Sequence, residues 1–238
     1  MIAHPATLSG LTSELISQVL FRHHVPFEEG VIVDPFAGVG SIHELRGPWD
    51  TWGIELEPEW ALEPIWSGWR QTDHNVWVTA DQGSWVVVGS CLDRGNWPLE
   101  LPVNAIVTSP CYGNRMADHH QPKEGSKRNT YRHTLGRPLT EGSAAAMQWG
   151  KEYQEFHEKA WCLAVDQLEP GGLFVLNISD HIRKGVRVPV EAWHLHLLSN
   201  LGLHLVEAQR IATKRQRFGR NGNVRVDGEL LAVLKKGF

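Results

Sequence analysis

The feature that most constrains the fold is the apolar run Val-Ile-Val at residues 31–33, which ends in Asp34 and Pro35 and leads into a turn with Gly38 and Gly40. A short run of β-branched residues bounded by turn residues is typical of a strand that is buried on both faces of a parallel sheet. Glycines allow the backbone to approach a ligand closely and to adopt positive φ angles. This region therefore predicts a strand, a tight turn and a helix at the sheet edge where α/β folds bind ligands.

Apolar runs and helical patterns alternate along the rest of the chain. They predict further strands at residues 51–55, 85–88, 105–108, 173–178, 204–212 and 226–234, and helices at residues 8–21, 58–69, 144–168 and 189–201. Ser9 or Thr12 can cap the first helix. The last two strands indicate an antiparallel hairpin. We therefore expect an α/β, Rossmann-like fold with a seven-stranded, mostly parallel sheet that ends in an antiparallel C-terminal hairpin.

Length and composition are those of an ordinary globular protein. The 238 residues, 42% apolar and 21% charged, fit one domain over residues 1–238. The sequence does not open on a basic region followed by an apolar run, as a signal peptide would, and no apolar run approaches the roughly 18 residues of a membrane span. The 3 cysteines are too widely spaced for a disulfide framework or a metal site. We therefore expect a cytoplasmic protein without a resident metal.

Charged residues are unevenly distributed, although the net charge is only −4. Residues 113–142 are rich in Gly, Pro, His, Lys and Arg and lack apolar periodicity, which predicts an inserted, irregular basic loop of roughly 30 residues. Residues 210–225 form a second basic segment, whereas acids gather at residues 55–63. This separation either gives the protein a basic face for nucleic-acid phosphates or reflects two solvated loops.

An acidic residue, Glu55, ends the strand that follows the glycine turn, about 20 residues further along the chain. A carboxylate in this position can accept hydrogen bonds from both hydroxyls of a ribose. The turn lacks the third glycine of the dinucleotide-binding pattern, which argues against a nicotinamide enzyme. The two features together favour a different cofactor that contains a nucleoside.

The strand at residues 105–108 leads directly into the motif Ser109, Pro110, Cys111, Tyr112. An exocyclic amine on an aromatic ring is a poor nucleophile because its lone pair is delocalised. The Ser109 hydroxyl and the Pro110 carbonyl can both accept hydrogen bonds from such an amine and aim its lone pair at a methyl donor, and proline stiffens this backbone. Tyr112 offers a ring for stacking on a base that has left the double helix. The motif therefore indicates chemistry on a base amino group.

The glycine turn and this motif resemble the two motifs of S-adenosylmethionine-dependent DNA amino-methyltransferases of the Ser-Pro-Pro-Tyr type, and residues 4–7 are similar to the motif that precedes their cofactor site. The resemblance implies a site-specific, base-flipping DNA methyltransferase whose cofactor is S-adenosyl-L-methionine. It implies that Ser109, Pro110 and Tyr112 are catalytic. It assigns the ribose to Glu55, the adenine amino group to Asp93, and cofactor binding to Asp34, Phe36, Ala37, Gly38, Gly40, Glu55, Asp93 and Thr108. Serine at the first motif position favours N4 of cytosine over N6 of adenine.

Cys111 departs from the family pattern, which has proline at this position. A Pro-Cys pair at the same strand end carries the nucleophile of cytosine C5-methyltransferases, so covalent catalysis by Cys111 is an alternative. Those enzymes also use a glutamate in a Glu-Asn-Val motif after the fifth strand. Residues 175–180 read Val-Leu-Asn-Ile-Ser-Asp and contain no glutamate. The comparison favours the amine mechanism, with Cys111 as a packing residue.

Residues that contact DNA are expected in the two basic segments. Arginine and asparagine commonly hydrogen-bond to guanine and adenine edges, and lysine and arginine to phosphates. The candidates are Asn114, Arg115, Lys127, Arg128, Arg132, Lys214, Arg215 and Arg217. Because no recognition domain of the usual size is present, we expect a short target sequence, a homodimer or low specificity. A chain this small resembles an orphan, phage-type enzyme, and a restriction–modification partner is left open.

Three other functions fit parts of the sequence. Similar Ser-Pro-Pro-Tyr motifs occur in RNA guanine-N2 methyltransferases, although those usually carry an additional RNA-binding domain. A small-molecule methyltransferase would not need the basic segments. A non-catalytic binding module with a degenerate methyltransferase fold would bind the cofactor without turnover, or not at all.

Overall fold

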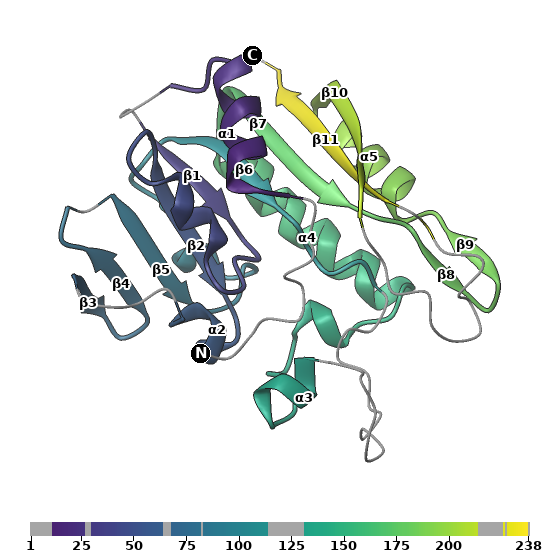
Figure 1. The fold of residues 1–238 in the computed structure, drawn as a ribbon, viewed down its shortest axis with the longest axis horizontal. Helices are drawn as coiled ribbons and strands as arrows, with labels where there is room; N and C mark the ends of the chain where they lie inside the picture. The colour runs from purple at the N-terminus through teal and green to yellow at the C-terminus, as the bar shows by residue number, and fades with distance from the viewer. Residues whose placement is uncertain are drawn as a thin grey trace.

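The computed structural model describes residues 11–26, 30–63, 68–81, 83–113, 131–213, 226 and 228–237. In this part of the chain a central β-sheet carries helices on both faces (Figure 1). The helical segments are α1 (Ser13–Arg22), η1 (Ser41–Leu45), α2 (Pro58–Ala61), η2 (Arg94–Asn96), α3 (Tyr131–Leu135), η3 (Ala144–Ala146), α4 (Lys151–Gln167) and α5 (Val190–Asn200). Thr12 caps α1 as expected, since its Oγ1 accepts a hydrogen bond from the Leu15 N–H at 3.2 Å.

The sheet has the strand order β10-β11-β7-β6-β1-β2-β5-β4-β3. Its strands are β1 (Val31–Asp34), β2 (Asp50–Glu55), β3 (Trp69–Asp73), β4 (Val76–Thr79), β5 (Ser84–Val88), β6 (Val103–Thr108), β7 (Leu168–Ile178), β10 (Leu203–Ala212) and β11 (Gly228–Lys236). Strands β1, β2, β5, β6 and β7 are parallel, while β11 runs antiparallel to β7 and β10 antiparallel to β11. The mostly parallel sheet with an antiparallel C-terminal hairpin is therefore confirmed.

Alternation along the central strands divides the core into two layers. Val31 and Val33 pack in the layer that contains α4 and α5, whereas Ile32 packs in the layer that contains α1. Successive side chains of a strand point to opposite faces, so a strand covered on both sides must be apolar throughout. This explains why the run at residues 31–33 has no polar member.

The helix predicted at residues 58–69 does not extend to its predicted last residue, because Trp69 begins a strand. Pro58–Ala61 is helical, residues 64–67 lie outside the described ranges, and Trp69–Asp73 forms β3. Strand β3 pairs with β4, and β4 pairs in turn with β5. Gly68 stands before β3 with a φ of +104°. Pairing with the neighbouring strand β4 therefore outweighs the local helical spacing of apolar residues at Trp69. The hairpin extends the expected seven strands to a nine-stranded sheet.

Three other segments differ from the sequence-based expectation. Within the loop expected to be irregular, Tyr131–Leu135 form α3, which is held by packing of Tyr131 against Trp60. The helix predicted at residues 144–168 is divided into η3 and α4 by a turn at residues 147–150. A separate hairpin of β8 (His181–Arg183) and β9 (Val186–Val188) was not predicted. None of the helices in the described ranges is long and apolar enough to span a membrane.

Candidate active site

The carboxyl ends of the parallel strands meet at one edge of the sheet. Asp34 ends β1, Glu55 ends β2 and Thr108 ends β6. Strands β2 and β6 flank β1 on either side, and neighbouring strands lie about 4.8 Å apart. The glycine turn after β1 therefore lies between the acidic residue after β2 and the Ser109 motif after β6. The structure brings these sequence motifs together as expected.

The glycine turn is folded around two carboxylates. Oδ1 of Asp34 accepts a hydrogen bond from the Phe36 N–H at 2.9 Å, and Oε2 of Glu55 accepts one from the Gly38 N–H at 2.9 Å. Gly38 and Gly40 have φ angles of +54° and +76°, the left-handed region that glycine adopts without a steric penalty. The turn is thus fixed by the side chains at the ends of β1 and β2.

Burial changes the acidity of both carboxyl groups. Desolvation raises the pKa of Asp34 to about 6, against smaller lowering contributions from the Phe36 N–H and the Thr108 hydroxyl. Desolvation also raises the pKa of Glu55 to about 7, although hydrogen bonds from the Glu57 and Gly38 N–H groups oppose the change. Additional hydrogen-bond donors or a nearby positive charge stabilise the ionised form of such poorly solvated carboxylates.

The Ser109 motif is part of a buried polar network. Ser109 Oγ lies 3.0 Å from the Tyr112 hydroxyl, and Asn177 Nδ2 lies 3.3 Å from Ser109 Oγ and 3.2 Å from the Tyr112 hydroxyl. Asn177 Nδ2 also donates to Glu229 Oε2 at 2.8 Å. Asn177 and Glu229 were not among the predicted site residues. The one available signal was that each is a polar residue next to an apolar run, residues 173–176 for Asn177 and residues 230–234 for Glu229.

Cys111 belongs to the same motif, but its thiol does not have the lowered pKa of a nucleophilic cysteine. Desolvation, reinforced by the negative charge of Glu55, raises the pKa of Cys111 to about 12 despite a hydrogen bond with Tyr131. Cys91 shows the same direction, because burial and the same carboxylate raise its pKa. A thiol must lose its proton to act as a nucleophile. Both cysteines therefore remain protonated at neutral pH.

Part of the segment expected to read DNA is instead neutralised by acids. Arg137 donates from Nε to Glu59 Oε1 and from Nη2 to Glu57 Oε2, both at 2.7 Å. Glu57 is only 1% exposed and also accepts hydrogen bonds from the N–H and the hydroxyl of Thr140 at 2.8 and 2.9 Å. These contacts hold residues 137–140 against α2, beside the strand end that carries Glu55. Arg137 is therefore engaged within the protein.

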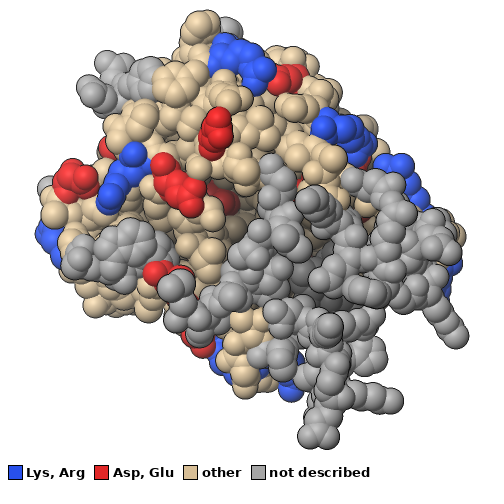
Figure 2. Space-filling view, in the orientation of Figure 1, with Lys and Arg blue, Asp and Glu red and all other residues tan. Residues whose placement is uncertain are grey.

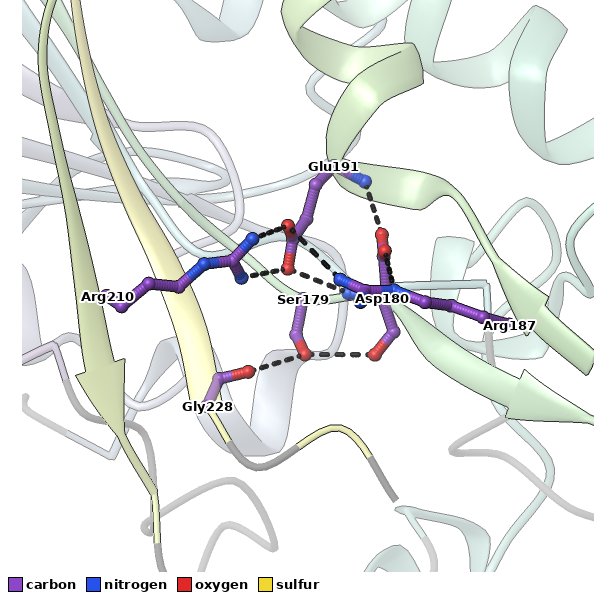
Figure 3. Close-up of polar contacts among 6 residues, drawn as sticks. All are labelled: Ser179, Asp180, Arg187, Glu191, Arg210 and Gly228. Atoms are coloured by element: carbon purple, nitrogen blue, oxygen red, sulfur yellow. Dashed lines mark hydrogen bonds and ion pairs between the residues drawn. The ribbon is translucent and has the colours of Figure 1, made fainter. Parts of the chain in front are cut away.

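A second cluster of charged residues joins the end of β7 to the start of α5 (Figure 3). Asp180 Oδ1 accepts from the Glu191 N–H at 2.9 Å, and Glu191 Oε1 accepts from the Asp180 N–H at 3.2 Å. Arg210 binds both Glu191 oxygens at 2.7 and 2.5 Å, and Arg187 Nε donates to Asp180 at 2.6 Å. Ser179 connects the same strand end to β11 through the Gly228 carbonyl at 3.1 Å. The cluster fixes the junction between the strand that carries Asn177 and helix α5.

Other predicted residues have different surroundings. The ring of Phe36 stacks on His157 at 5.7 Å and packs edge-on against Trp161 at 5.7 Å, so Phe36 contributes to the core beside the turn. Asp93 is exposed and caps η2 by accepting from the Gly95 N–H at 3.0 Å. Of the expected DNA contacts, Arg132 is exposed on α3. Asn114, Arg115, Lys127, Arg128, Lys214, Arg215 and Arg217 lie outside the described residues, as do Ser9 and residues 4–7.

The described lysine and arginine side chains form no continuous basic surface on the face drawn in Figure 2. In Figure 2 the described lysine and arginine side chains are scattered, and acidic side chains lie mainly in the left half of the view. Among the described residues, no group of His, Cys, Asp and Glu is arranged to hold a metal ion.

Solved structures with a similar fold cover almost the whole chain. The 1,6-didemethyltoxoflavin-N1-methyltransferase of Burkholderia thailandensis, which contains bound S-adenosylhomocysteine, aligns with a TM-score of 0.54 at 13% identity over 98% of this chain and 80% of its own. A S-adenosylmethionine-dependent methyltransferase of Clostridium acetobutylicum gives 0.52 at 12% identity over 95% and 91%. The N-methyltransferase NodS of Bradyrhizobium japonicum gives 0.51 at 15% identity over 94% and 96%.

The sequence itself matches no protein-family model and no curated protein. At such low sequence identities, similarity of structure establishes the fold and leaves the substrate open. The chain has the fold of S-adenosylmethionine-dependent methyltransferases.

Proposed function

We propose that this chain transfers a methyl group from S-adenosylmethionine to an exocyclic amino group of a DNA base, with N4 of cytosine preferred to N6 of adenine. The observation that carries the proposal is the adjacency of two motifs. Ser109 and Pro110 follow β6, and the turn closed by Glu55 follows β1, the strand next to β6. An amine held by the first motif lies within reach of a methyl donor held by the second, and this proximity is the main requirement for direct transfer.

The residues around the glycine turn fit S-adenosylmethionine. Glu55 and Asp34 have raised pKa values because burial leaves their carboxylates poorly solvated. Ribose hydroxyls would supply hydrogen-bond donors to Glu55, and the two acidic side chains together suit a ligand with positively charged sulfonium and ammonium groups. When bound, S-adenosylmethionine supplies an electrophilic methyl group. The positive φ angles of Gly38 and Gly40 let the backbone of the turn approach the ligand.

The polar network around Ser109 prepares an acceptor for the substrate amine. One of the two Asn177 Nδ2 protons is donated to Glu229, and the other is shared by Ser109 Oγ and the Tyr112 hydroxyl. The Ser109 proton can be directed to the Tyr112 hydroxyl 3.0 Å away. A hydroxyl oxygen with two acceptor sites then keeps one of them for the amine. Together with the Pro110 carbonyl, this gives the amine two acceptors held in place before the substrate binds.

Methylation at C5 of cytosine is a weaker candidate. It requires a Cys111 thiolate, and burial raises the pKa of Cys111 to about 12. A nucleophile with this pKa is almost entirely protonated near neutral pH. RNA and small-molecule methylation share the amine chemistry, so the choice between them and DNA depends on the experiment.

The proposal is tested by incubating the protein with radiolabelled S-adenosylmethionine and either unmethylated DNA or RNA, then identifying the labelled nucleoside by mass spectrometry. We expect N4-methylcytosine or, second, N6-methyladenine. Ser109→Ala should abolish most of the transfer, whereas Ser84→Ala, which removes a buried hydroxyl at the amino-terminal end of β5, should not. Label as C5-methylcytosine, label only in RNA, or binding without transfer would each overturn the proposal.

A further inference from the structure

Two backbone carbonyls after Pro110 are held by groups from other parts of the chain. The Tyr153 hydroxyl on α4 donates to the Cys111 carbonyl at 2.8 Å, and the Trp149 N–H donates to the Gly113 carbonyl at 2.8 Å. Among the described residues, none donates a hydrogen bond to the Pro110 carbonyl.

Gly113 is required for this arrangement. Its φ is +65°, and a Cβ at this position would lie 3.1 Å from the Trp149 nitrogen and 3.2 Å from Tyr153 Cδ2. Any other residue would therefore combine backbone strain with crowding against α4. The motif backbone is thus in close contact with the start of α4. Tyr153 contributes to this contact through its ring, beside Gly113, and through its hydroxyl, on the Cys111 carbonyl.

A chain of hydrogen bonds determines the direction of the Tyr153 proton. Trp161 Nε1 can only donate, and it lies 2.8 Å from His194 Nδ1. His194 Nδ1 is therefore unprotonated, so Nε2 carries the proton and donates to the Tyr153 oxygen at 2.8 Å. Tyr153 must in turn donate to the Cys111 carbonyl. Burial, reinforced by His157, lowers the pKa of His194 well below its ordinary value. The ring is therefore neutral, as these hydrogen-bond directions require.

Tyr153, His194 and Trp161 are all fully buried. We propose that Tyr153 is a positioning residue of the active site: by holding the Cys111 carbonyl, it fixes the backbone that presents the Pro110 carbonyl to the acceptor amine. This inference rests on the function proposed above. The Pro110 and Cys111 carbonyls belong to consecutive planar peptide units, so fixing one restricts the orientation of the other. An acceptor held in place beforehand costs no reorganisation during the reaction.

The test compares Tyr153→Phe with Ser84→Ala. Each substitution removes one hydroxyl from a fully buried residue, so the two should lower the melting temperature to a similar degree. We expect Tyr153→Phe to lower kcat roughly tenfold, with the Kd for S-adenosylmethionine unchanged. Ser84→Ala should keep its kcat. A purely structural role of Tyr153 predicts instead that both variants lose activity only in proportion to their loss of stability.

A spectroscopic measurement tests the hydrogen bond independently of turnover. Cys111 and Tyr112 form the single Cys-Tyr pair in the sequence, so carbonyl-13C cysteine with 15N tyrosine gives one amide signal coupled to the Cys111 carbonyl. We expect this carbonyl resonance to move upfield in Tyr153→Phe and to remain in place in Ser84→Ala. An unmoved resonance, or an unchanged kcat, would overturn the inference. Absence of methyl transfer by the wild type would overturn the proposed function, and the resonance would still decide whether Tyr153 holds the motif.

Discussion

The Gly38 N–H donates a hydrogen bond of 2.9 Å to Glu55, so the turn after β1 is closed by the carboxylate at the end of β2. The second oxygen of the same carboxylate accepts from the Glu57 N–H at 2.8 Å. One side chain therefore shapes the turn and also offers its remaining acceptor positions to a ligand. This double role makes Glu55 the most informative position for tests of cofactor binding.

Glu55→Gln should weaken the binding of S-adenosylmethionine at least tenfold, because hydrogen bonds to a charged acceptor contribute about 1.5–3 kcal/mol. Glutamine keeps the shape of the side chain but loses the charge and one acceptor oxygen. Isothermal titration calorimetry measures the change. Glu44→Gln, at an exposed position of η1, is the matched control and should bind as the wild type does. Equal affinities for all three proteins would exclude Glu55 from the cofactor site.

The raised pKa of Glu55 should also affect stability. Its folded-state value of about 7 lies above the ordinary 4.5, so the folded protein binds this proton more tightly than the unfolded chain does. The contribution of Glu55 to the free energy of unfolding is therefore largest below about pH 4.5 and decreases as the pH rises to about 7.

Comparison with a variant isolates this contribution, because His43, His157 and His194 have lowered pKa values and act in the opposite direction. Glu55→Gln cannot ionise. Its free energy of unfolding, relative to the wild type, should therefore increase between about pH 4.5 and 7 in urea titrations. A difference that stays constant over this range would show that the pKa of Glu55 is not raised.

Asn177→Asp should place a second carboxylate beside Glu229, where the amide nitrogen now donates at 2.8 Å. Two carboxylates at this distance repel each other when both are ionised. We expect a larger fall in the melting temperature at about pH 8 than at about pH 5. The double variant Asn177→Asp with Glu229→Gln restores a donor and an acceptor and should recover most of the loss. Failure of this rescue would indicate that the pair does not interact as described.

Arg137→Ala should destabilise the protein more than Glu59→Ala. The arginine neutralises Glu57, which is 1% exposed, whereas the side chain of Glu59 is 33% exposed. Removing the partner of a buried charge costs about 3–5 kcal/mol, while an exposed pair contributes about 0–1 kcal/mol. Urea unfolding of both variants gives the comparison. Equal losses of unfolding free energy in the two variants would mean that water, rather than Arg137, solvates the Glu57 carboxylate.

The sequence identified those site residues whose positions follow from strand direction alone. Asp34, Glu55 and Ser109 each follow a strand, and parallel strands bring their carboxyl ends to the same edge. Glu229 could not be found in this way, because its contact with Asn177 depends on β11 pairing with β7 in a register that places Leu231 opposite Asn177. Arg137 and Glu57 are separated by 80 positions in the sequence. Their contact depends on how residues 131–140 pack against α2.

The β3–β4 hairpin was missed for a related reason. The apolar residues within positions 58–69 recur at helical spacing, but Trp69 pairs with Thr79 of β4, which in turn pairs with β5. Local periodicity contains no information about that partner. The same limitation applies to Tyr153, which lies within a correctly predicted helical stretch but whose role depends on a contact with the Cys111 carbonyl.

Cys111→Ala should retain most methyl transfer, since the thiol is too weakly acidic to serve as a nucleophile. Burial and the charge of Glu55 raise the pKa of Cys111 to about 12, so the reactive thiolate is a negligible fraction near neutral pH. Alanine preserves the backbone carbonyl that accepts from Tyr153 and removes only the sulfur. The rate of transfer to DNA is the measurement, and covalent trapping with a 5-fluorocytosine substrate is the second. Loss of all transfer, with a trapped protein–DNA adduct in the wild type, would replace the amine mechanism by attack of Cys111 on the base.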